Sequence, residues 1–476
     1  MASHEEIAAI GFQRFGLGWR LGQSEGIRRE ARERMLAEIE ARNPAPVASR
    51  PGVAEIGAAL FAFEDREKLV REARRSPVPA QGPTPERVAA DAKSGAEPME
   101  ARPREPNLPF QTYRDEVTAR MALALEAETG LTERLVLFWS NHFCVAATKG
   151  NIGRAMAGAF EREAIRPHVF GRFEDMLVAV VSHPAMLDFL DNRQSIGPGS
   201  PAGKRRGRGL NENLAREILE LHTLGVHGGY SQEDVTSLAR IITGWTMVGR
   251  EAVLGFPGSF AFNAALHEPG PQRLLGRSYD QTGKAQGLAA LGDLARHPAT
   301  ARFIGLKLAR HFVADAPAPA LVQNLADSFS RSAGDLAQVT RTLLSADEAW
   351  GAPPAKIRSP QEFLIAACRA LGRNPDFGEV HGRLSVMGQP FWQPAGPNGY
   401  PDSNAAWASP EGIKTRVDVA SGWGRQAAGT TPDPRELAER SLGPLASDET
   451  RRAVARAESK PQALALLLMS PEFQRR

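Results

Sequence analysis

Apolar residues recur at helical spacing along most of this chain, and this pattern restricts the folds that the chain can adopt. The pattern is persistent from Phe110 onward, where successive segments each present one apolar side. Only residues 249–281 are typical of extended structure, because Val253–Phe256 and Ser259–Phe262 flank the turn residues Pro257-Gly258. The sequence therefore predicts a mainly α fold with long loops and one small β-hairpin near residues 250–281.

The predicted helices fall into two groups separated by a proline-rich segment. Residues 1–75 are predicted to form a helical segment that packs on the main domain. Residues 76–109 contain many prolines and few large apolar side chains, which is typical of a linker or a mobile loop. Residues 110–476 are predicted to form the main helical domain. A chain of 476 residues is long enough for two or three domains, so length alone leaves the domain count open.

Composition argues against several classes of function. The formal net charge is only +3, which gives no electrostatic reason to expect nucleic acid as a partner. No transmembrane segment and no signal peptide are predicted, so we expect a soluble, cytoplasmic protein. Cys144 and Cys368 lie in apolar runs and are expected to be buried free thiols. The sequence also lacks a phosphate-binding loop, a dinucleotide fingerprint, a Cys-x-x-Cys pair and an α/β-hydrolase elbow.

One predicted helix, residues 211–224, carries more ionisable side chains than a core helix usually does. Asn211 is its predicted N-cap and Gly225 its stop. A helical wheel places His222 on the apolar side and the following residues on the polar side: Glu212, Asn213, Arg216, Glu217 and Glu220. Arg216 is four residues from both Glu212 and Glu220, so it can bridge them. The pattern fits a solvated helix face. It also fits a network that supplies an acid and a base, or that binds a divalent metal through Glu217 and Glu220.

The loop that precedes this helix favours the second interpretation. Residues 195–210 are rich in glycine and contain the basic residues Lys204, Arg205, Arg206 and Arg208. Glycine backbone and cationic side chains at the positive end of a helix form a setting that attracts anions.

Other candidate residues lie outside this helix. Asn141-His142, between aromatic residues, is either a structural clamp or part of a site. Asp191-Asn192 either end a helix or lie at the rim of a cleft. His267-Glu268 precede Pro269, which excludes a helical zinc motif but leaves both a turn and a site loop open. Three further histidines are interpreted as cap or core residues: His183, His297 and His311.

Several motifs in a fixed order resemble the bacterial family catalogued as domain of unknown function 1800. These motifs are Arg14–Gly18, Phe138–Phe143, His183–Leu187 with Leu190–Asn192, Asn211–Glu217 with Glu220–Gly225, Gly244–Thr246, His267-Glu268, Lys307–Phe312 and Pro397–Pro401. The resemblance covers nearly the whole chain and implies one large, mostly helical unit. It also implies a partner of the phosphatase/sulfatase-like class. Many members of the family are exported, whereas this chain shows no signal, so export would need a partner.

Two functions of different classes are consistent with these residues. The first is a hydrolase or group-transfer enzyme acting on a polar substrate of carbohydrate-like or anionic character. Its catalytic residues would be Glu217, Glu212, His142 and His267, and its substrate-binding residues Asn141, Asp191, Asn192, Asn211, Asn213, Arg216, Trp392, Tyr400 and Trp407. The alternative is a non-catalytic binding or maturation partner of a phosphatase/sulfatase-like protein, in which the polar helix is a buried structural network.

Overall fold

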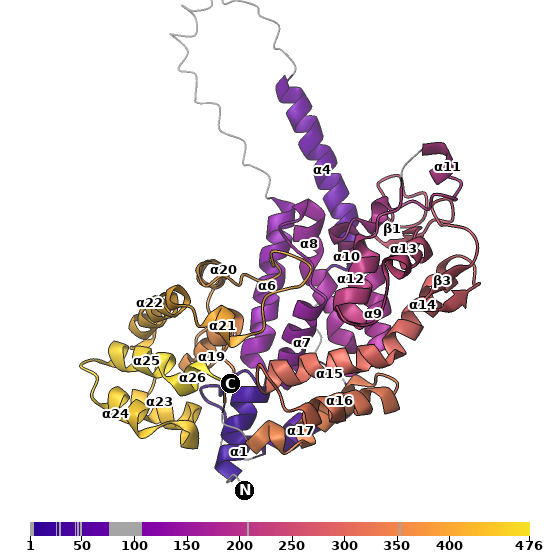
Figure 1. Cartoon of the computed structure of the whole chain (residues 1–476). Helices are drawn as coiled ribbons and strands as arrows, with labels where there is room; N and C mark the ends of the chain where they lie inside the picture. Colours follow the sequence, from indigo (N-terminus) through magenta and orange to yellow (C-terminus); the bar gives the residue numbers. More distant parts are fainter. Residues whose placement is uncertain are drawn as a thin grey trace, which may run out of the picture.

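The protein is mainly α-helical, as predicted, with two small pairs of strands (Figure 1). The computed structural model describes residues 4–24, 26–27, 30–42, 44, 47, 50–75, 107–206, 209–351 and 354–476. The N-terminal part contains α1 (His4–Ile10), η1 (Gly11–Phe15), α3 (Ala31–Ala41) and α4 (Val53–Arg75). The proline-rich segment predicted at 76–109 lies almost entirely outside the described residues. The proposed division at residues 75 and 110 therefore stays a prediction.

The central part of the chain contains most of the short helices. Its elements are α6 (Leu108–Glu126), α7 (Leu131–His142), α8 (Gly150–Phe160), η2 (Glu161–Ile165), η3 (Arg166–His168), α9 (Phe173–Ser182), α10 (Pro184–Phe189), η4 (Asn192–Gln194), α11 (Gly203–Arg206), α12 (Asn213–Glu217), η5 (Ile218–Thr223) and α13 (Gln232–Ile241). The segments η1, η2 and η5 are π-helical. The predicted helix 211–224 is thus one ordinary helical segment followed directly by a wider π-helical one.

The later helices complete the fold. They are α14 (Lys284–Arg296), α15 (Pro298–Phe312), α16 (Pro319–Arg331), α17 (Leu336–Ser345), α18 (Glu348–Gly351), α19 (Pro360–Leu371), α20 (Phe377–Val386), α21 (Asn404–Trp407), α22 (Pro410–Ala427), α23 (Pro434–Ser441), η6 (Gly443–Leu445), α24 (Asp448–Ala455), α25 (Lys460–Met469) and α26 (Pro471–Gln474). No helix among the described residues is both long and apolar enough to cross a membrane.

Local chemistry explains where several helices begin. α13 begins with a capping box, because the Ser231 hydroxyl accepts the Asp234 backbone N–H and the Asp234 carboxylate accepts the Ser231 backbone N–H. His183 and His297 each accept a backbone N–H two residues on, so both are caps, as predicted. Ser359 caps α19 in the same way, and Gly372 ends that helix in the left-handed conformation.

The predicted hairpin is correct in position but wrong in pairing. β2 (Phe260–Phe262) pairs antiparallel with β1 (Trp245–Met247), which lies outside the predicted hairpin residues 250–281. Residues 253–256 form no strand: Gly258, with a φ of +82°, packs backbone to backbone against Gly57 of α4 and holds this segment as a loop. A second pair joins β3 (Gln272–Leu274) to β4 (Arg277–Tyr279).

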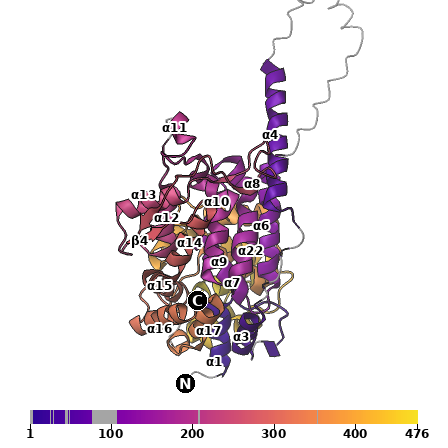
Figure 2. The ribbon, with the colours of Figure 1, turned by 90° about the vertical axis from the view of Figure 1, so that its right-hand side faces the viewer.

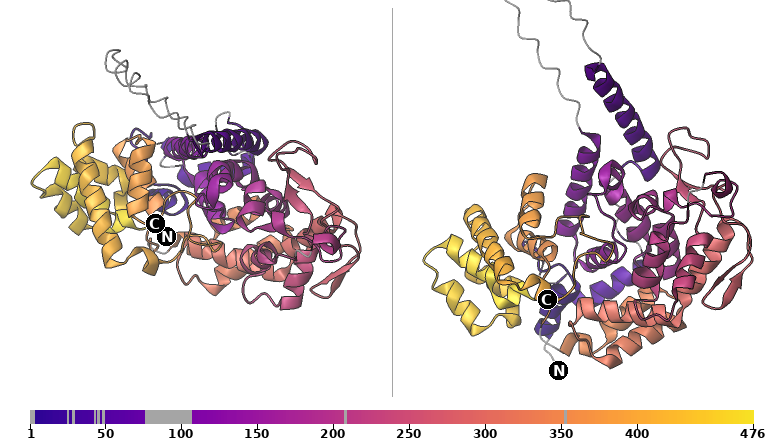
Figure 3. Two further views of the ribbon diagram at one scale, coloured as in Figure 1. Left: turned by 90° about the horizontal axis from the view of Figure 1, so that it is seen from above. Right: turned by 45° about the horizontal axis from the view of Figure 1, so that its top comes forward.

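A single cluster of buried apolar residues runs from the N-terminal to the C-terminal helices. Among its members Trp139, Trp245 and Trp423 are almost completely buried. Helices α6 to α10 lie in the centre of the molecule, with α15 to α17 along one side and α22 to α26 in a lobe on the other (Figure 1). The second half of α4 extends away from the body (Figure 2). Helix α1 packs against η6 and helix α3 packs against α17, and Figure 3 gives two further views of this arrangement.

Candidate functional site

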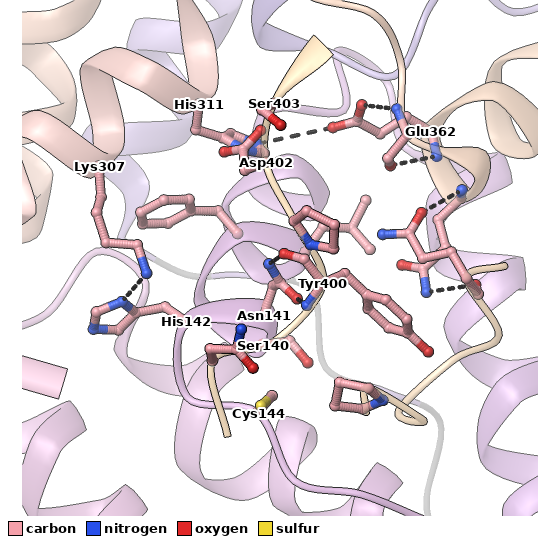
Figure 4. Close-up of a pocket in the computed structure, with 18 of the residues that line it drawn as sticks. Ser140, Asn141, His142, Cys144, Lys307, His311, Glu362, Tyr400, Asp402 and Ser403 are labelled. Carbon is pink, nitrogen blue, oxygen red and sulfur yellow. Dashed lines mark hydrogen bonds and ion pairs between the residues drawn. The ribbon is translucent and has the colours of Figure 1, made fainter. Parts of the chain in front are cut away.

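A pocket of about 440 Å³ lies where three helices meet one long loop. The walls come from α7, α15, the start of α19 and the loop 389–403 (Figure 4). Its polar lining residues include Ser140, Asn141, His142, Cys144, Glu161, Lys307, Arg310, His311, Asp315, Gln361, Glu362, Gln389, Tyr400, Asp402, Ser403 and Arg476. The pocket therefore collects ionisable groups from segments that are far apart in the sequence.

Side chains at the end of α7 fix the loop that closes the pocket. The Asn141 amide binds the backbone of Tyr400 at two points: its Oδ1 accepts the Tyr400 N–H at 2.7 Å and its Nδ2 donates to the Tyr400 carbonyl at 2.9 Å. Gly399 has a φ of +73°, and a Cβ there would lie 2.5 Å from the Asn141 carbonyl oxygen. The Cys144 thiol lies 3.3 Å from the Pro397 carbonyl, and burial raises its pKa to about 12. Asn141 is thus a structural clamp as well as a pocket residue.

Lys307 and His142 form a hydrogen-bonded pair in the pocket wall. Lys307 Nζ lies 3.0 Å from His142 Nδ1, and His142 Nε2 lies 3.1 Å from the carbonyl oxygen of His222. Because a carbonyl can only accept, Nε2 must carry the proton, which leaves the Nδ1 lone pair to accept from Lys307. Burial and the Lys307 charge keep the pKa of His142 well below its usual range, so the ring is neutral. Burial also lowers the pKa of Lys307 to about 8.

The opposite wall contains carboxylates that are already paired with cations. Asp402 accepts from His311 Nδ1 at 2.8 Å and lies 3.2 Å from Lys356 Nζ and 3.6 Å from Arg476. Burial alone would raise the pKa of Asp402, but His311 and the neighbouring cations outweigh burial and lower it strongly. Lys356 also binds Asp315 at 2.6 Å. These acids are therefore ionised and satisfied within the protein.

Glu362 is held in the same manner. Its carboxylate binds Arg134, lies 2.8 Å from Arg476 Nε and accepts the Ser359 backbone N–H at 2.8 Å. Burial opposes the charged form, yet the charges of Arg134 and Arg476 bring the pKa of Glu362 down to about 2. Burial and the Arg476 charge lower the pKa of Arg134 only to about 10, so the pair is fully charged at neutral pH.

The groups that remain free in the pocket are hydrogen-bond donors. Within the described residues, the hydroxyls of Ser140 and Ser403 make no hydrogen bond to other protein groups. Lys307 is bonded only to His142, and Arg310 uses only its Nε, which donates to the Asp315 carbonyl at 3.2 Å. The carboxylates of the pocket already have cationic partners, whereas Lys307 and Arg310 have no carboxylate partner among the described residues. The pocket is therefore suited to a ligand that accepts hydrogen bonds and carries negative charge.

Four of the residues predicted from sequence line this pocket: Asn141, His142, Trp392 and Tyr400. The two aromatic residues are held internally as well. The Trp392 indole donates to Glu161 at 3.1 Å, and the Tyr400 hydroxyl donates to the Pro390 carbonyl at 2.6 Å. Trp392 also has a φ of +50°, an uncommon conformation for a bulky residue. Trp407 does not line the pocket, and its indole donates to the Pro401 carbonyl at 3.0 Å.

The polar face of α12 lies elsewhere, against α13. Glu212 accepts from Gln232 at 2.8 Å and from Thr236 at 2.7 Å, and pairs with Arg216 at 3.2 Å. The predicted bridge from Arg216 to a second glutamate is not formed among the described contacts, because Arg216 turns to Gln232 instead. The predicted cap needs one correction: α12 begins at Asn213, and the Asn211 side chain accepts the Asn213 N–H at 2.9 Å.

Glu217 and Glu220 also lie outside the pocket lining. Burial and the nearby Glu220 charge raise the pKa of Glu217, and the Tyr230 hydroxyl lies 3.5 Å from Glu220. Among the described residues no group of three or more histidine, cysteine, aspartate or glutamate side chains is placed to hold a metal ion. A divalent metal bound by these two glutamates and a catalytic role for the α12 face both stay predictions.

The remaining predicted residues hold loops together. Asn192 donates to the carbonyls of Ile242 and Trp245, and Asp191 pairs with Lys149 at 2.8 Å. His267 Nδ1 lies 3.0 Å from the Thr243 carbonyl. These residues do not line the pocket, so their predicted substrate and catalytic roles have no geometric support there.

Several ionisable residues of the pocket wall were not predicted as site residues: Lys307, His311, Glu362, Asp402 and Arg476. His311 was interpreted as a cap or core residue. The segments Lys307–Phe312 and Pro397–Pro401 both belong to the motifs of the family resemblance, so the sequence marked each of them. Neither motif indicates that the two segments meet in the fold.

Comparison with known proteins yields one match. A family model described as protein of unknown function (DUF1800) matches residues 11–475. No curated protein and no solved structure matches the chain.

Proposed function

The chain belongs to the DUF1800 family, whose description assigns no activity, so we propose a function from the pocket alone. We propose a hydrolase or group-transfer enzyme that acts on a polar, anionic substrate. Lys307 and His142 stand at the reacting end of the pocket. The observation that carries this proposal is the Lys307 ammonium in the pocket wall, bonded to a neutral histidine instead of a carboxylate.

The anionic character of the substrate follows from the unpaired donors. A substrate carboxylate or phosphate would accept from Lys307, Arg310 and the Ser140 and Ser403 hydroxyls without displacing an internal ion pair. It would meet no free carboxylate, because Asp402 already contacts the His311 ring and the cations Lys356 and Arg476. Specificity for an anion thus needs no rearrangement of the walls.

The reaction class follows from the proton held by Lys307. A pKa of about 8 lies close to physiological pH, where an amine can both keep a proton and release it to a leaving group. His142 orients the amine, and the His222 carbonyl holds the histidine in the required tautomer. Asn141 and Tyr400 position the loop over the substrate, with Trp392 as part of the wall.

A panel of chromogenic esters tests the proposal. The p-nitrophenyl esters of phosphate, sulfate and acetate compare two anions with a neutral substrate of similar leaving group. We expect turnover of an anionic ester, and a loss of about 100-fold or more in kcat/KM for Lys307→Met. Lys414→Met, which changes an exposed lysine on α22, serves as the matched control and should not change the rate.

The pH profile gives a second readout. If Lys307 delivers a proton, kcat/KM should fall as pH rises through about 8, because the amine then loses its proton. A preference for the neutral ester, or a Lys307→Met variant as active as the native protein, would contradict the proposal.

A second candidate function is the non-catalytic partner of a phosphatase/sulfatase-like protein. One surface feature supports it: the loop before β2 exposes Val253 at 84% and Phe256 at 57% of their surface. If this loop binds such a protein, Phe256→Ser should abolish co-elution of the two purified proteins in gel filtration. An unchanged complex, or no complex with the native chain, would remove this candidate.

A further inference from the structure

We propose that Lys307 is a nucleophilic amine that forms an imine with an aldehyde or ketone bound in the pocket, and that this carbonyl compound carries a carboxylate or phosphate group. The inference rests on the proposed function in its group-transfer form, and it narrows the substrate to an anionic carbonyl compound.

The bonding of Lys307 differs from that of Lys356 and Lys149. Lys356 bridges Asp315 at 2.6 Å and Asp402 at 3.2 Å, and Lys149 pairs with Asp191 at 2.8 Å. A carboxylate partner holds a lysine as an ammonium ion, which has no lone pair. Within the described part of the chain Lys307 forms no such ion pair, and its partner is the Nδ1 lone pair of His142. A neutral amine satisfies that contact equally well, because it still has two N–H donors.

The surroundings of the amine disfavour its charge. Phe138, an apolar residue, lines the same wall. The Phe303 ring centre lies 5.5 Å from Lys307 Nζ and attracts the charged form, but burial outweighs this attraction. Burial lowers the Lys307 pKa to about 8; the negative charge of Asp402 opposes this shift, and the like charge of Arg310, one helical turn away, adds to it. Roughly a quarter of the amine is then neutral at pH 7.5, against about a thousandth for an exposed lysine. Attack on a carbonyl requires this neutral form.

The step balances without any further reactant. The amine lone pair attacks the carbonyl carbon and forms the C–N bond. The two N–H protons end on the carbonyl oxygen, which leaves as water when the C=N bond forms. Nothing is oxidised or reduced. His142 accepts one N–H throughout the approach and so directs the lone pair away from itself.

Other residues of the pocket can bind the negatively charged group of the same carbonyl compound. Arg310, Ser140 and Ser403 have donors that no other protein group occupies among the described residues. A volume of about 440 Å³ accommodates a small carboxylate- or phosphate-bearing carbonyl compound beside Lys307. The amine and the anion-binding donors thus face one cavity.

Reductive trapping tests the imine directly on the native full-length protein. The protein is incubated with glyoxylate and sodium cyanoborohydride at pH 7.5, digested, and the modified lysines are measured by mass spectrometry. Cyanoborohydride transfers hydride to the imine carbon and leaves a stable secondary amine. We expect Lys307 to react about ten-fold or more faster than Lys149 and Lys414, because far more of its amine is neutral. Its rate should rise with pH to a plateau above about 8.

Two comparisons test whether the negative charge of the probe increases its reaction with Lys307. Acetaldehyde replaces glyoxylate as a probe without charge, and the rate at Lys307 is divided by the rate at Lys414 for each probe. This ratio should be larger for glyoxylate than for acetaldehyde, and Arg310→Gln should remove the difference. Lys307→Arg keeps the charge and should give no product at this position.

Equal modification of Lys307 and the two surface lysines would overturn the imine. Equal ratios for glyoxylate and acetaldehyde would overturn the anionic carbonyl substrate. Failure here is distinguishable from failure of the proposed function. Ester turnover that depends on Lys307 without trapping leaves Lys307 as a proton donor, whereas trapping without turnover leaves the imine chemistry and removes the hydrolase.

Discussion

Glu362→Gln is the substitution whose effect on stability can be worked out most directly from the structure. The change keeps the size of the side chain and removes the negative charge between Arg134 and Arg476. Both guanidinium groups are almost fully buried, as is Glu362 itself. An amide cannot neutralise them, so the variant keeps two buried cations with a weaker partner.

The magnitude follows from the pKa of Glu362. Lowering it from 4.5 to about 2 corresponds to a stabilisation of about 3 kcal/mol. Removing one partner of a buried ion pair costs about 3–5 kcal/mol in general, which agrees with this value. Total stabilities of domains are only about 5–15 kcal/mol, so the loss is a large part of the whole.

Urea denaturation at pH 7 measures this loss as a fall in the midpoint with an unchanged slope. Glu436→Gln is the matched control, because Glu436 pairs with Arg440 on the surface and its side chain is 49% exposed. The control should change stability by less than about 0.5 kcal/mol.

The pH dependence provides the second half of the test. Since the folded pKa of Glu362 is depressed, its stabilisation is complete above pH 4.5 and is lost as pH falls towards 2. The difference between native protein and Glu362→Gln should shrink over that window. A Glu362→Gln variant within 0.5 kcal/mol of the native protein at pH 7, on the scale of the surface control, would refute the reasoning.

Three further changes have expected results. Asn141→Ala removes both hydrogen bonds to the Tyr400 backbone. Hydrogen exchange at the Tyr400 amide should then become faster by a factor that corresponds to about 2 kcal/mol, and it should stay slower than in the unfolded protein. Ser231→Ala removes the cap of α13 and should lower the free energy of unfolding by about 1 kcal/mol in urea; no change would contradict the capping role. Gly225→Ala puts a Cβ 2.8 Å from the Phe303 ring at a φ of +82°, so the melting temperature should fall by several degrees, corresponding to about 1–3 kcal/mol.

The fold class was predictable because helical periodicity and helix caps are local properties. The Ser231 capping box and the two histidine caps are decided by residues within a few positions of each other. Strand pairing is not local. Residues 253–256 have the side chains of a strand, but the contact of Gly258 with Gly57, far away in sequence, keeps them in a loop.

The site was predictable only in part, for a similar reason. Asn141 and His142 are marked by their own context, as a polar pair between aromatic residues. Lys307 looks like an ordinary helix residue, but burial in the fold lowers its pKa, and its hydrogen-bond partner His142 lies 165 positions away. Conversely, the α12 face has a conspicuous pattern, yet Glu212 and Arg216 are used in contacts with α13.

The contact between Arg134 and Glu362 spans 228 residues, and Arg476 joins Glu362 from 114 residues farther along. Closing loops of this length costs conformational entropy before any contact forms, so such pairs form slowly during folding. The helices α7 and α15 can therefore fold before the loop 389–403 reaches them. A chain at that stage has nearly all of its helices and no pocket. After dilution from denaturant, far-ultraviolet circular dichroism should recover first, and protection of the Tyr400 amide from hydrogen exchange should follow in a slower phase.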